Sequence, residues 1–501
     1  MIGDPPRLAA EGRRLEARVA RRTAARLRRA RTRLGSTPPE ASPILAALEG
    51  TLAALPPDAR RRILYGPDLR GFLGEAEAWI GVLRLAAAAG LGGSRSGARG
   101  RHRTRTLERL FDRIGRTEHL ATLLPRRRVD ARLPERAARF ARRRLRQAFR
   151  DLASFVIGLR LAHSVAGRFE AWLEFREDAE QGRPADRIDL GTLAGPAGPL
   201  SIVAVRSASP RSVRARLLSG TLILRSPGEP EIVLPAAGSR LRAADLRCLG
   251  GDRGARPAPA GPRRTEPQGL ARREMIPGTS ILLAPCVVSL PRRLTVGRPV
   301  PGLARRLADA LRIVRLAWPE GYREILAQTS MVVPVRERGL VSYSLASRPG
   351  LSFINVSGKT TLDLADDLLH ESAHHRLHGL EEIDRFLARG PATEEVQAFD
   401  SPWRGTRRPL HGLLHGGYTF LFRAELFRRV LRAARAHTGL FAPLLRPRGA
   451  AWIRRELRRE IAMLSDALRD LEGAAREGLL TPAGRRLLRA MGSWAGRLRR
   501  R

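Results

Sequence analysis

Cysteine is almost absent from this chain of 501 residues, which contains only Cys248 and Cys286. Two cysteines exclude a disulfide-stapled scaffold and a cysteine-rich metal site. Long apolar runs are also missing, since the longest, at 78–91, is interrupted by Arg84 and is too short to cross a bilayer. The N-terminal segment lacks the apolar stretch of a signal peptide. We therefore expect a cytoplasmic protein with no membrane partner.

Lysine and asparagine are each present once, as Lys359 and Asn355, so arginine supplies nearly all of the 92 basic residues. Lysine and asparagine codons are AT-rich and arginine codons are GC-rich, so this bias indicates a GC-rich genome. The net charge of +43 still favours anionic partners such as acidic peptides. No recognised nucleic-acid-binding motif accompanies the charge, and a specific nucleic-acid partner is not expected.

The pattern of apolar residues predicts several regions in a chain that is 43 % hydrophobic. Apolar spacings of three and four predict helices at 1–88 and 106–181, separated by a flexible Gly/Ser/Arg-rich linker at 89–105. Short β-branched runs between glycines and prolines predict a β-rich region at 182–300. A metal-site module follows at 301–440, and helices at 441–501. The predicted fold class is α+β, mainly helical, with a central β-rich segment and a C-terminal HExxH metal-helix module.

Within the module, strands are predicted at about 330–337, 339–346 and 350–356, followed by a helix that starts near 361. Thr360 or Thr361 can cap this helix, and Asp363 in its first turn is favoured by the helix dipole. Lys359 and Asn355 lie just before the helix. Their survival in a chain depleted of both residue types suggests a local requirement, although coincidence explains it as well.

Histidine is concentrated around this helix, where six of the ten histidines fall between positions 370 and 415. The first of them begins an HExxH motif, His370-Glu371-Ser372-Ala373-His374. Residues four apart lie on nearly the same helix face, so His370 and His374 can reach one divalent metal. Glu371 lies beside them, close enough to contact a metal-bound water or to orient a ligand. The sequence therefore predicts a metal site.

A third protein ligand must come from elsewhere in the chain. A thermolysin-like site would take a downstream glutamate, and the candidates are Glu381, Glu382, Glu394 and Glu395. The metzincin pattern is excluded, because its glycine and third histidine are missing after His374. The other option is a histidine of the segment SPWRGTRRPLHGLLHGGY, either His411 or His415.

This segment carries a resemblance to a known family. Together with FINVS and LLHESAHH it is similar to the HExxH-type putative peptide-modification proteins of ribosomal-peptide natural product pathways. The upstream segment LPPDARRRILYGPDLRGFL is similar to the N-terminal part of that family. The resemblance covers most of 45–435 and is specific at 350–422. It implies an iron(II)/2-oxoglutarate-dependent β-hydroxylase whose partners are a ribosomal precursor peptide and, in some pathways, other maturation enzymes.

The resemblance also implies roles for individual residues. His370 and His374 match the first two metal ligands, and His415 matches the third, with His411 as the alternative. Arg404 and Arg408 correspond to places where the carboxylate of 2-oxoglutarate could be held, because a planar guanidinium matches a carboxylate.

Two other functions remain open from the residues alone. The first is a zinc metallopeptidase with Glu371 as general base. The second is a non-catalytic scaffold that binds a peptide. The remaining polar residues near the motif are interpreted as structural: His375 as structural or solvent-facing, His378 as a surface residue or one that contacts a ligand, and Tyr343 and Tyr418 as half-buried.

Overall fold

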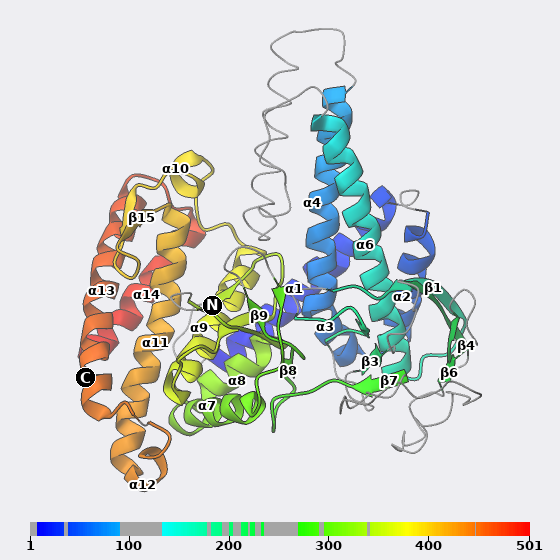
Figure 1. Ribbon diagram of the computed structural model, residues 1–501. Coiled ribbons are helices and arrows are strands. Elements are labelled where there is room, and N and C mark those ends of the chain that lie inside the picture. The colour runs from blue at the N-terminus through cyan, green and yellow to red at the C-terminus, as the bar shows by residue number, and fades with distance from the viewer. Residues whose placement is uncertain are drawn as a thin grey trace. The chain divides into compact units, whose positions relative to one another are not determined.

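The computed structural model describes residues 8–34, 39–90, 133–177, 182–192, 200–203, 212–218, 221–225, 232–234, 269–289, 295–337, 341–445 and 447–500. The chain forms two compact units (Figure 1). Unit 1 comprises Met1–Arg22, Met275–Leu283 and Pro299–Arg501, and unit 2 comprises Thr23–Glu274 and Ala284–Arg298. Helices with several small sheets confirm the mainly helical α+β class. The predicted linker at 89–105 lies outside the described residues except for 89–90.

Helices form the core of unit 2. They are the second half of α1 (Leu8–Leu34), then α2 (Ala41–Ala54), α3 (Pro57–Tyr65), α4 (Pro67–Gly90) and α6 (Leu133–Ala162). Pro57 and Pro67 each begin a helix, where the missing N–H removes no intrahelical hydrogen bond. Between α4 and α6 the rings of Phe72 and Phe149 pack edge to face, with centroids 5.1 Å apart.

Small antiparallel sheets complete unit 2. One has the order β1-β4-β5-β6, from β1 (Phe169–Glu174), β4 (Ser212–Leu218), β5 (Thr221–Arg225) and β6 (Ile232–Leu234). Another has the order β2-β3-β7, from β2 (Arg187–Asp189), β3 (Leu200–Val203) and β7 (Gly269–Arg272). A hairpin pairs β9 (Val288–Ser289) with β10 (Thr295–Val296). Strands therefore occupy the region that the sequence predicts to be β-rich.

The prediction that 106–181 is helical throughout is wrong beyond Ala162, where α6 ends. The chain turns through Ser164 and Gly167, which have φ angles of 52° and 106°, and β1 begins at Phe169. Phe169 and Leu173 of β1 are buried, and the strand pairs residue by residue with β4. The apolar spacing of four between these two residues fits a helix as well as a strand, so only the partner strand decides. Residues 106–132 lie outside the described part of the chain.

Unit 1 contains a buried parallel pair of strands. β11 (Met331–Val335) pairs in parallel with β13 (Leu351–Asn355) and with β8 (Leu282–Leu283), and β12 (Tyr343–Ser344) pairs antiparallel with β13. Every residue of β11 and β13 is buried, as is usual for strands covered on both faces. Helices α7 (Leu303–Ala317) and α8 (Pro319–Gln328) precede β11. Two of the three predicted strands are thus present, and the third is shortened to β12.

The metal-motif helix α9 (Thr361–Glu381) begins where the sequence predicts. Thr360 caps it, because its Oγ1 accepts a hydrogen bond from the Asp363 backbone N–H at 3.2 Å. The Asp363 carboxylate accepts the Thr360 backbone N–H at 2.9 Å, which completes a capping box. This box fixes the start of the helix, and therefore the side on which the histidines of the motif lie.

Helix α11 (Leu410–Ala436) packs against α9 and against α13 (Ala450–Arg476) and α14 (Pro482–Arg499). Figure 1 shows α11, α13 and α14 running side by side in unit 1. Between α9 and α11 lie α10 (Pro391–Glu394) and the hairpin of β14 (Phe399–Ser401) and β15 (Thr406–Arg408), and α12 (Thr438–Phe441) follows α11. The hairpin and the start of α11 thus come together at the motif-bearing helix.

A buried ion pair anchors α9 on its other side. Arg376 is 1 % exposed and donates two hydrogen bonds of 3.0 Å to the carboxylate of Glu324 on α8. Its other terminal nitrogen donates to Glu11 of α1 at 3.2 Å. Breaking such a pair from one side leaves an uncompensated buried charge, whereas replacing both partners by apolar residues does not.

Arg376→Met is therefore expected to lower the free energy of unfolding by about 3–5 kcal/mol. The double variant Arg376→Met with Glu324→Met is expected to recover most of that loss, because no charge remains buried without a partner at that contact. Urea denaturation of the three proteins measures both effects. A double variant no more stable than Arg376→Met would show that the pair does not behave as a buried ion pair.

Candidate metal centre

The half-exposed residues of α9 form one stripe on an otherwise buried helix. They include Asp367, His370, His374, His378 and Glu381, spaced by three and four residues. Such spacing places them on one helix face. Four of the five are histidine or glutamate, so the only accessible side of this part of α9 is lined with metal-binding side chains.

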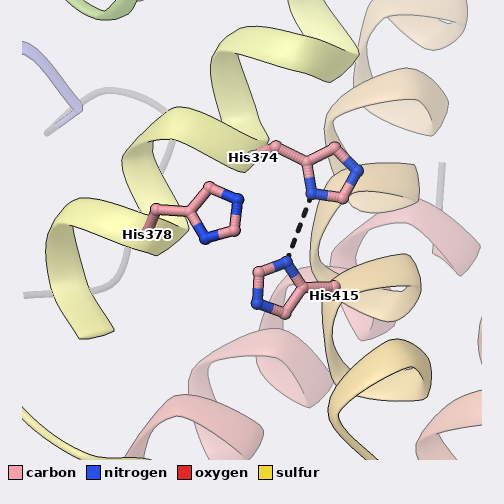
Figure 2. A group of neighbouring side chains, drawn as sticks. All are labelled: His374, His378 and His415. Carbon is pink, nitrogen blue, oxygen red and sulfur yellow. Dashed lines mark hydrogen bonds between the residues drawn. The ribbon is translucent and has the colours of Figure 1, made fainter. Parts of the chain in front are cut away.

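His415 of α11 faces this stripe. Its Nδ1 lies 3.3 Å from Nδ1 of His374, the contact drawn in Figure 2. Two ligands that each lie about 2.0–2.1 Å from one metal are about 2.8–3.0 Å apart in octahedral geometry and about 3.3–3.4 Å apart in tetrahedral geometry. The two imidazoles therefore already have the separation that a shared cation requires. Their helices are separated by the α10 and hairpin segment, so packing, and not local sequence, brings them together.

His374 belongs to two overlapping groups of possible ligands. In one it lies with His370 and Glu371, and in the other with His378 and His415, and the ligand atoms within each group all lie within 4.8 Å of one another. Figure 2 shows His378 turning a ring nitrogen toward the His374–His415 pair. The predicted ligands His370 and His415 therefore each belong to a group with His374, but to none together among the described residues.

Sequence reasoning missed His378 as a possible ligand. It lies one helical turn beyond His374, at the same spacing that separates His370 from His374, so the signal was a second HxxxH. Each step of four residues advances about 40° around the helix. His378 consequently still faces His415, and the two ring centroids are 4.9 Å apart.

Glu381 is the predicted downstream glutamate that reaches the site. It lies at the end of α9, and its Oε1 is 3.0 Å from Nε2 of His415 and 3.2 Å from Nε2 of His411. These three residues form a further group of possible ligands. The other predicted glutamates, Glu382, Glu394 and Glu395, belong to none of the groups among the described residues.

Burial favours the neutral form of His370, His374 and His415. Burial, helped by the nearby charges of Arg423 and Arg404, lowers the pKa of His370 to about 3. Burial lowers the pKa of His415 to about 4, although Glu381 opposes the shift, and it lowers the pKa of His374 as well. A neutral imidazole has a free lone pair, which is the form that binds a metal.

Glu371 is held in an unfavourable environment. Burial raises its pKa to about 8, and the nearby Ser344 hydroxyl opposes the shift only in part. Its Oε2 is buried and has no hydrogen-bond partner among the described atoms. This environment therefore favours the protonated carboxyl. A divalent ion beside it would favour the ionised form.

At Glu381 the balance between burial and the neighbouring groups is the opposite. Burial alone would raise its pKa, but the charge of His415 and hydrogen bonds with three imidazoles bring the pKa well below its usual range. Burial likewise lowers the pKa of His411, but the adjacent Glu381 carboxylate more than offsets this and the net shift is upward. Glu381 is thus ionised at neutral pH.

The β14–β15 hairpin forms a wall beside His370. Trp403, in the turn of the hairpin, stacks on Phe420 with ring centroids 4.4 Å apart. The rings of Phe420 and His370 pack edge to face, with centroids 4.8 Å apart. The Trp403 indole N–H donates to Glu460 of α13 at 3.0 Å, which fixes the ring. The hairpin is therefore held in place by α11 and α13 together.

The hairpin also carries the two arginines predicted to bind a carboxylate. Arg404 is exposed and lies near enough to His370 and Glu371 for its charge to lower the pKa of both. Arg408 is half-buried, and burial together with Arg404 lowers its own pKa. Among the described residues neither forms an ion pair with a carboxylate, whereas Arg407 between them contacts Asp400.

The remaining residues singled out by the sequence have structural contacts. Asn355 donates to the Glu337 carbonyl at 2.7 Å, and Lys359 pairs with Asp367 at 3.2 Å. His375 is buried, with its two ring nitrogens at hydrogen-bonding distance from Gly350 and Ser352 of the sheet, so its structural interpretation agrees with the structure. Tyr343 is half-buried, as the sequence predicts, and stacks on Phe353. The prediction that Tyr418 is half-buried is wrong, because this residue is 1 % exposed and packs beside Arg376.

No protein-family model matches the chain, and a search of curated proteins finds no match. The resemblance to HExxH-type peptide-modification proteins thus stays a prediction from the motifs. In the part of the chain that the structure describes, no helix is long and apolar enough to span a membrane.

His374 belongs both to the group with His370 and to the group with His415. His374→Ala is therefore expected to lower the bound metal by one equivalent per chain. Elemental analysis after loading and desalting measures this. The matched control is His437→Ala, an exposed histidine that follows the last residue of α11. It is about 33 Å along the helix axis from His415, at about 1.5 Å per residue. Equal metal content in the two variants would contradict a site at His374.

Proposed function

We propose that this protein is a metal-dependent peptide-modifying enzyme, and that its reaction is the iron(II)/2-oxoglutarate-dependent β-hydroxylation of a ribosomally made peptide. The observation that carries the proposal is the pair of His374 and His415 ring nitrogens, 3.3 Å apart on two helices. His370 is assigned as the third ligand from the motif, with its ring 4.9 Å from that of His374. Imidazole donors suit iron and zinc, and three protein ligands leave positions open.

Bound iron would supply the oxygen chemistry: peptide, O2 and 2-oxoglutarate give hydroxylated peptide, succinate and CO2. The chain's own residues have simpler tasks. His370, His374 and His415 present neutral nitrogens, and Glu371 holds or releases a proton beside them. Trp403 and Phe420 form an aromatic wall beside His370. These groups shape one side of the space in which a peptide side chain would lie.

Arg404 and Arg408 support the assignment of 2-oxoglutarate. They repel one another and lack a carboxylate partner among the described residues, in a protein where buried carboxylates such as Glu324 and Glu460 have arginine partners. A dicarboxylate would relieve the repulsion and could be bound bidentately. The influence of Arg404 on His370 places this charge beside the proposed iron ligands.

The peptide partner rests on charge and on the motif resemblance. The face of β1, β4 and β5 presents Arg214, Arg216 and Arg225 together with Glu170, which pairs with Arg214, so the arginines outnumber the carboxylate. Trp172 on β1 is 45 % exposed. The arginines and Trp172 together suit an acidic peptide segment, which electrostatic attraction would draw to the protein. A ribosomal precursor peptide is made in the cytoplasm, so we also propose that this protein acts in the cytoplasm.

One observation favours a second candidate, a zinc metallopeptidase. The unpartnered, buried Oε2 of Glu371 next to His370 suits a general base that takes a proton from an attacking water. The two candidates differ in their products. The peptidase cleaves a peptide bond with no need for 2-oxoglutarate, whereas the hydroxylase adds one oxygen atom and releases succinate.

The direct test loads the purified protein with iron(II) under anaerobic conditions and adds 2-oxoglutarate, air and a precursor peptide encoded beside its gene. Mass spectrometry is expected to show a gain of one oxygen, with succinate formed in step. Zinc in place of iron should abolish the gain. Cleavage that proceeds with zinc and without 2-oxoglutarate would replace this proposal by the peptidase.

The arginines give a separate prediction. Arg404→Ala and Arg408→Ala are expected to raise the KM for 2-oxoglutarate at least tenfold, since a charge-assisted pair contributes about 1.5–3 kcal/mol. Arg407→Ala, on the same hairpin but paired with Asp400, is the matched control and should change the KM less than twofold. Equal effects of all three substitutions would mean that only the folding of the hairpin matters.

A comparison of two further variants decides the ligand set on α9. His370→Ala should lose the iron equivalent, whereas His378→Ala should keep it. The reverse result would assign the metal to the three imidazoles of Figure 2 and remove His370 from the proposal.

A further inference from the structure

His415 is engaged through both of its ring nitrogens. Nδ1 lies 3.3 Å from His374, and Nε2 lies 3.0 Å from Oε1 of Glu381. Its side chain is 8 % exposed, so neither nitrogen has open access to water. The proposed iron site uses only the first nitrogen. The second lies in a separate group of donors with Glu381 and His411.

The surroundings of Glu381 are unusual for this protein. Its described contacts are all with imidazoles: His415, His411, and His378, whose Nδ1 lies 3.4 Å from Oε2. Other largely buried carboxylates pair with arginine, as Glu324 does with Arg376, Glu425 with Arg428 and Glu460 with Arg423. The described contacts of Glu381 are therefore all to nitrogens that can also bind a metal, and Glu381, His411 and His415 offer one ligand atom each within 4.8 Å of one another.

The spacing of the donors fits one ion. Glu381 Oε1 lies 3.0 Å from one imidazole nitrogen and 3.2 Å from the other, within the about 2.8–3.4 Å that separates ligands of one cation in octahedral to tetrahedral geometry. His411 is 47 % exposed, so the group opens to solvent on that side and a water can complete the coordination. The donor set of two imidazoles and one carboxylate is one that zinc takes in enzymes.

The dipoles of α9 and α11 have nearly balanced effects on a cation bound at this position. Glu381 ends α9, where the negative end of the dipole favours a cation by about 0.3–1 kcal/mol. His411 lies in the first turn of α11, where the positive end opposes a cation by a similar amount. The two dipole effects therefore nearly cancel, and the arrangement of the three donor atoms decides whether a cation binds.

We propose that Glu381, His411 and His415 form a second metal site, which binds zinc, and that His415 bridges it to the first site. The inference rests on the proposed function only in taking the His374–His415 pair as part of the first site. With one metal bound, the Nε2–H of His415 donates to Glu381. Binding of the second metal replaces that proton, which leaves to the solvent, so His415 becomes a bridging imidazolate.

The test is the stoichiometry of zinc bound to the full-length metal-free protein, measured by equilibrium dialysis and elemental analysis. Wild type is expected to bind two equivalents. His411→Ala and Glu381→Gln should each bind one, and His415→Ala, which removes a ligand of both sites, should bind none. The matched controls Glu394→Gln and His437→Ala, both in exposed positions, should bind two.

Cobalt(II) substitution and proton release provide readouts independent of activity. Filling of the second site should add an absorption band of a tetrahedral centre in wild type, absent from His411→Ala, and should release one further proton per chain. Because His411 is exposed, His411→Ala is not expected to disturb folding. Saturation of wild type at one equivalent, or unchanged stoichiometry in His411→Ala, would overturn the proposal and leave Glu381 as a residue that only orients His415.

These results separate the two proposals. Two bound metals without peptide hydroxylation would support the second site and reject the proposed reaction. Hydroxylation by a protein that binds only one metal would support the proposed reaction and reject the second site.

Discussion

The approach of His374 and His415 is the contact on which the rest of this site depends. The HExxH motif supplies only two imidazoles, and both come from one side of the site. Packing of α11 on α9 supplies the donor from the opposite side. The two helices are connected through α10 and a hairpin, so the site exists only in the folded unit 1.

Several structural features hold these helices in register. The Thr360–Asp363 capping box sets the first turn of α9, and the Arg376–Glu324 pair fixes the face of α9 opposite the histidines. On the other side, Arg423 of α11 contacts Asp366 of α9 and Glu460 of α13, and Trp403 donates to the same Glu460. Burial raises the pKa of Asp366 to about 7, despite the Arg423 charge. Charged side chains are thus concentrated where α9, α11 and α13 pack together, and small changes in this packing would alter their ionisation.

Much of this arrangement was predictable where it follows from local spacing. The start of α9, the shared face of His370 and His374 and the buried strands β11 and β13 all follow from residue order. The positions of His378 and Glu381 relative to His415 do not, because they depend on how two helices separated by 28 residues pack. The strand β1 was missed for the same reason, since its pairing with β4 is a long-range contact. His370 and His378 lie about one helical turn on either side of His374, so spacing does not decide which of them completes the ligand set.

The most direct measurement is a diffraction experiment on crystals loaded anaerobically with iron(II), with data collected at the iron absorption edge. The account predicts an anomalous peak within about 2.0–2.2 Å of ring nitrogens of both His374 and His415. A peak that touches neither residue, or no bound iron in a correctly folded protein, would contradict it.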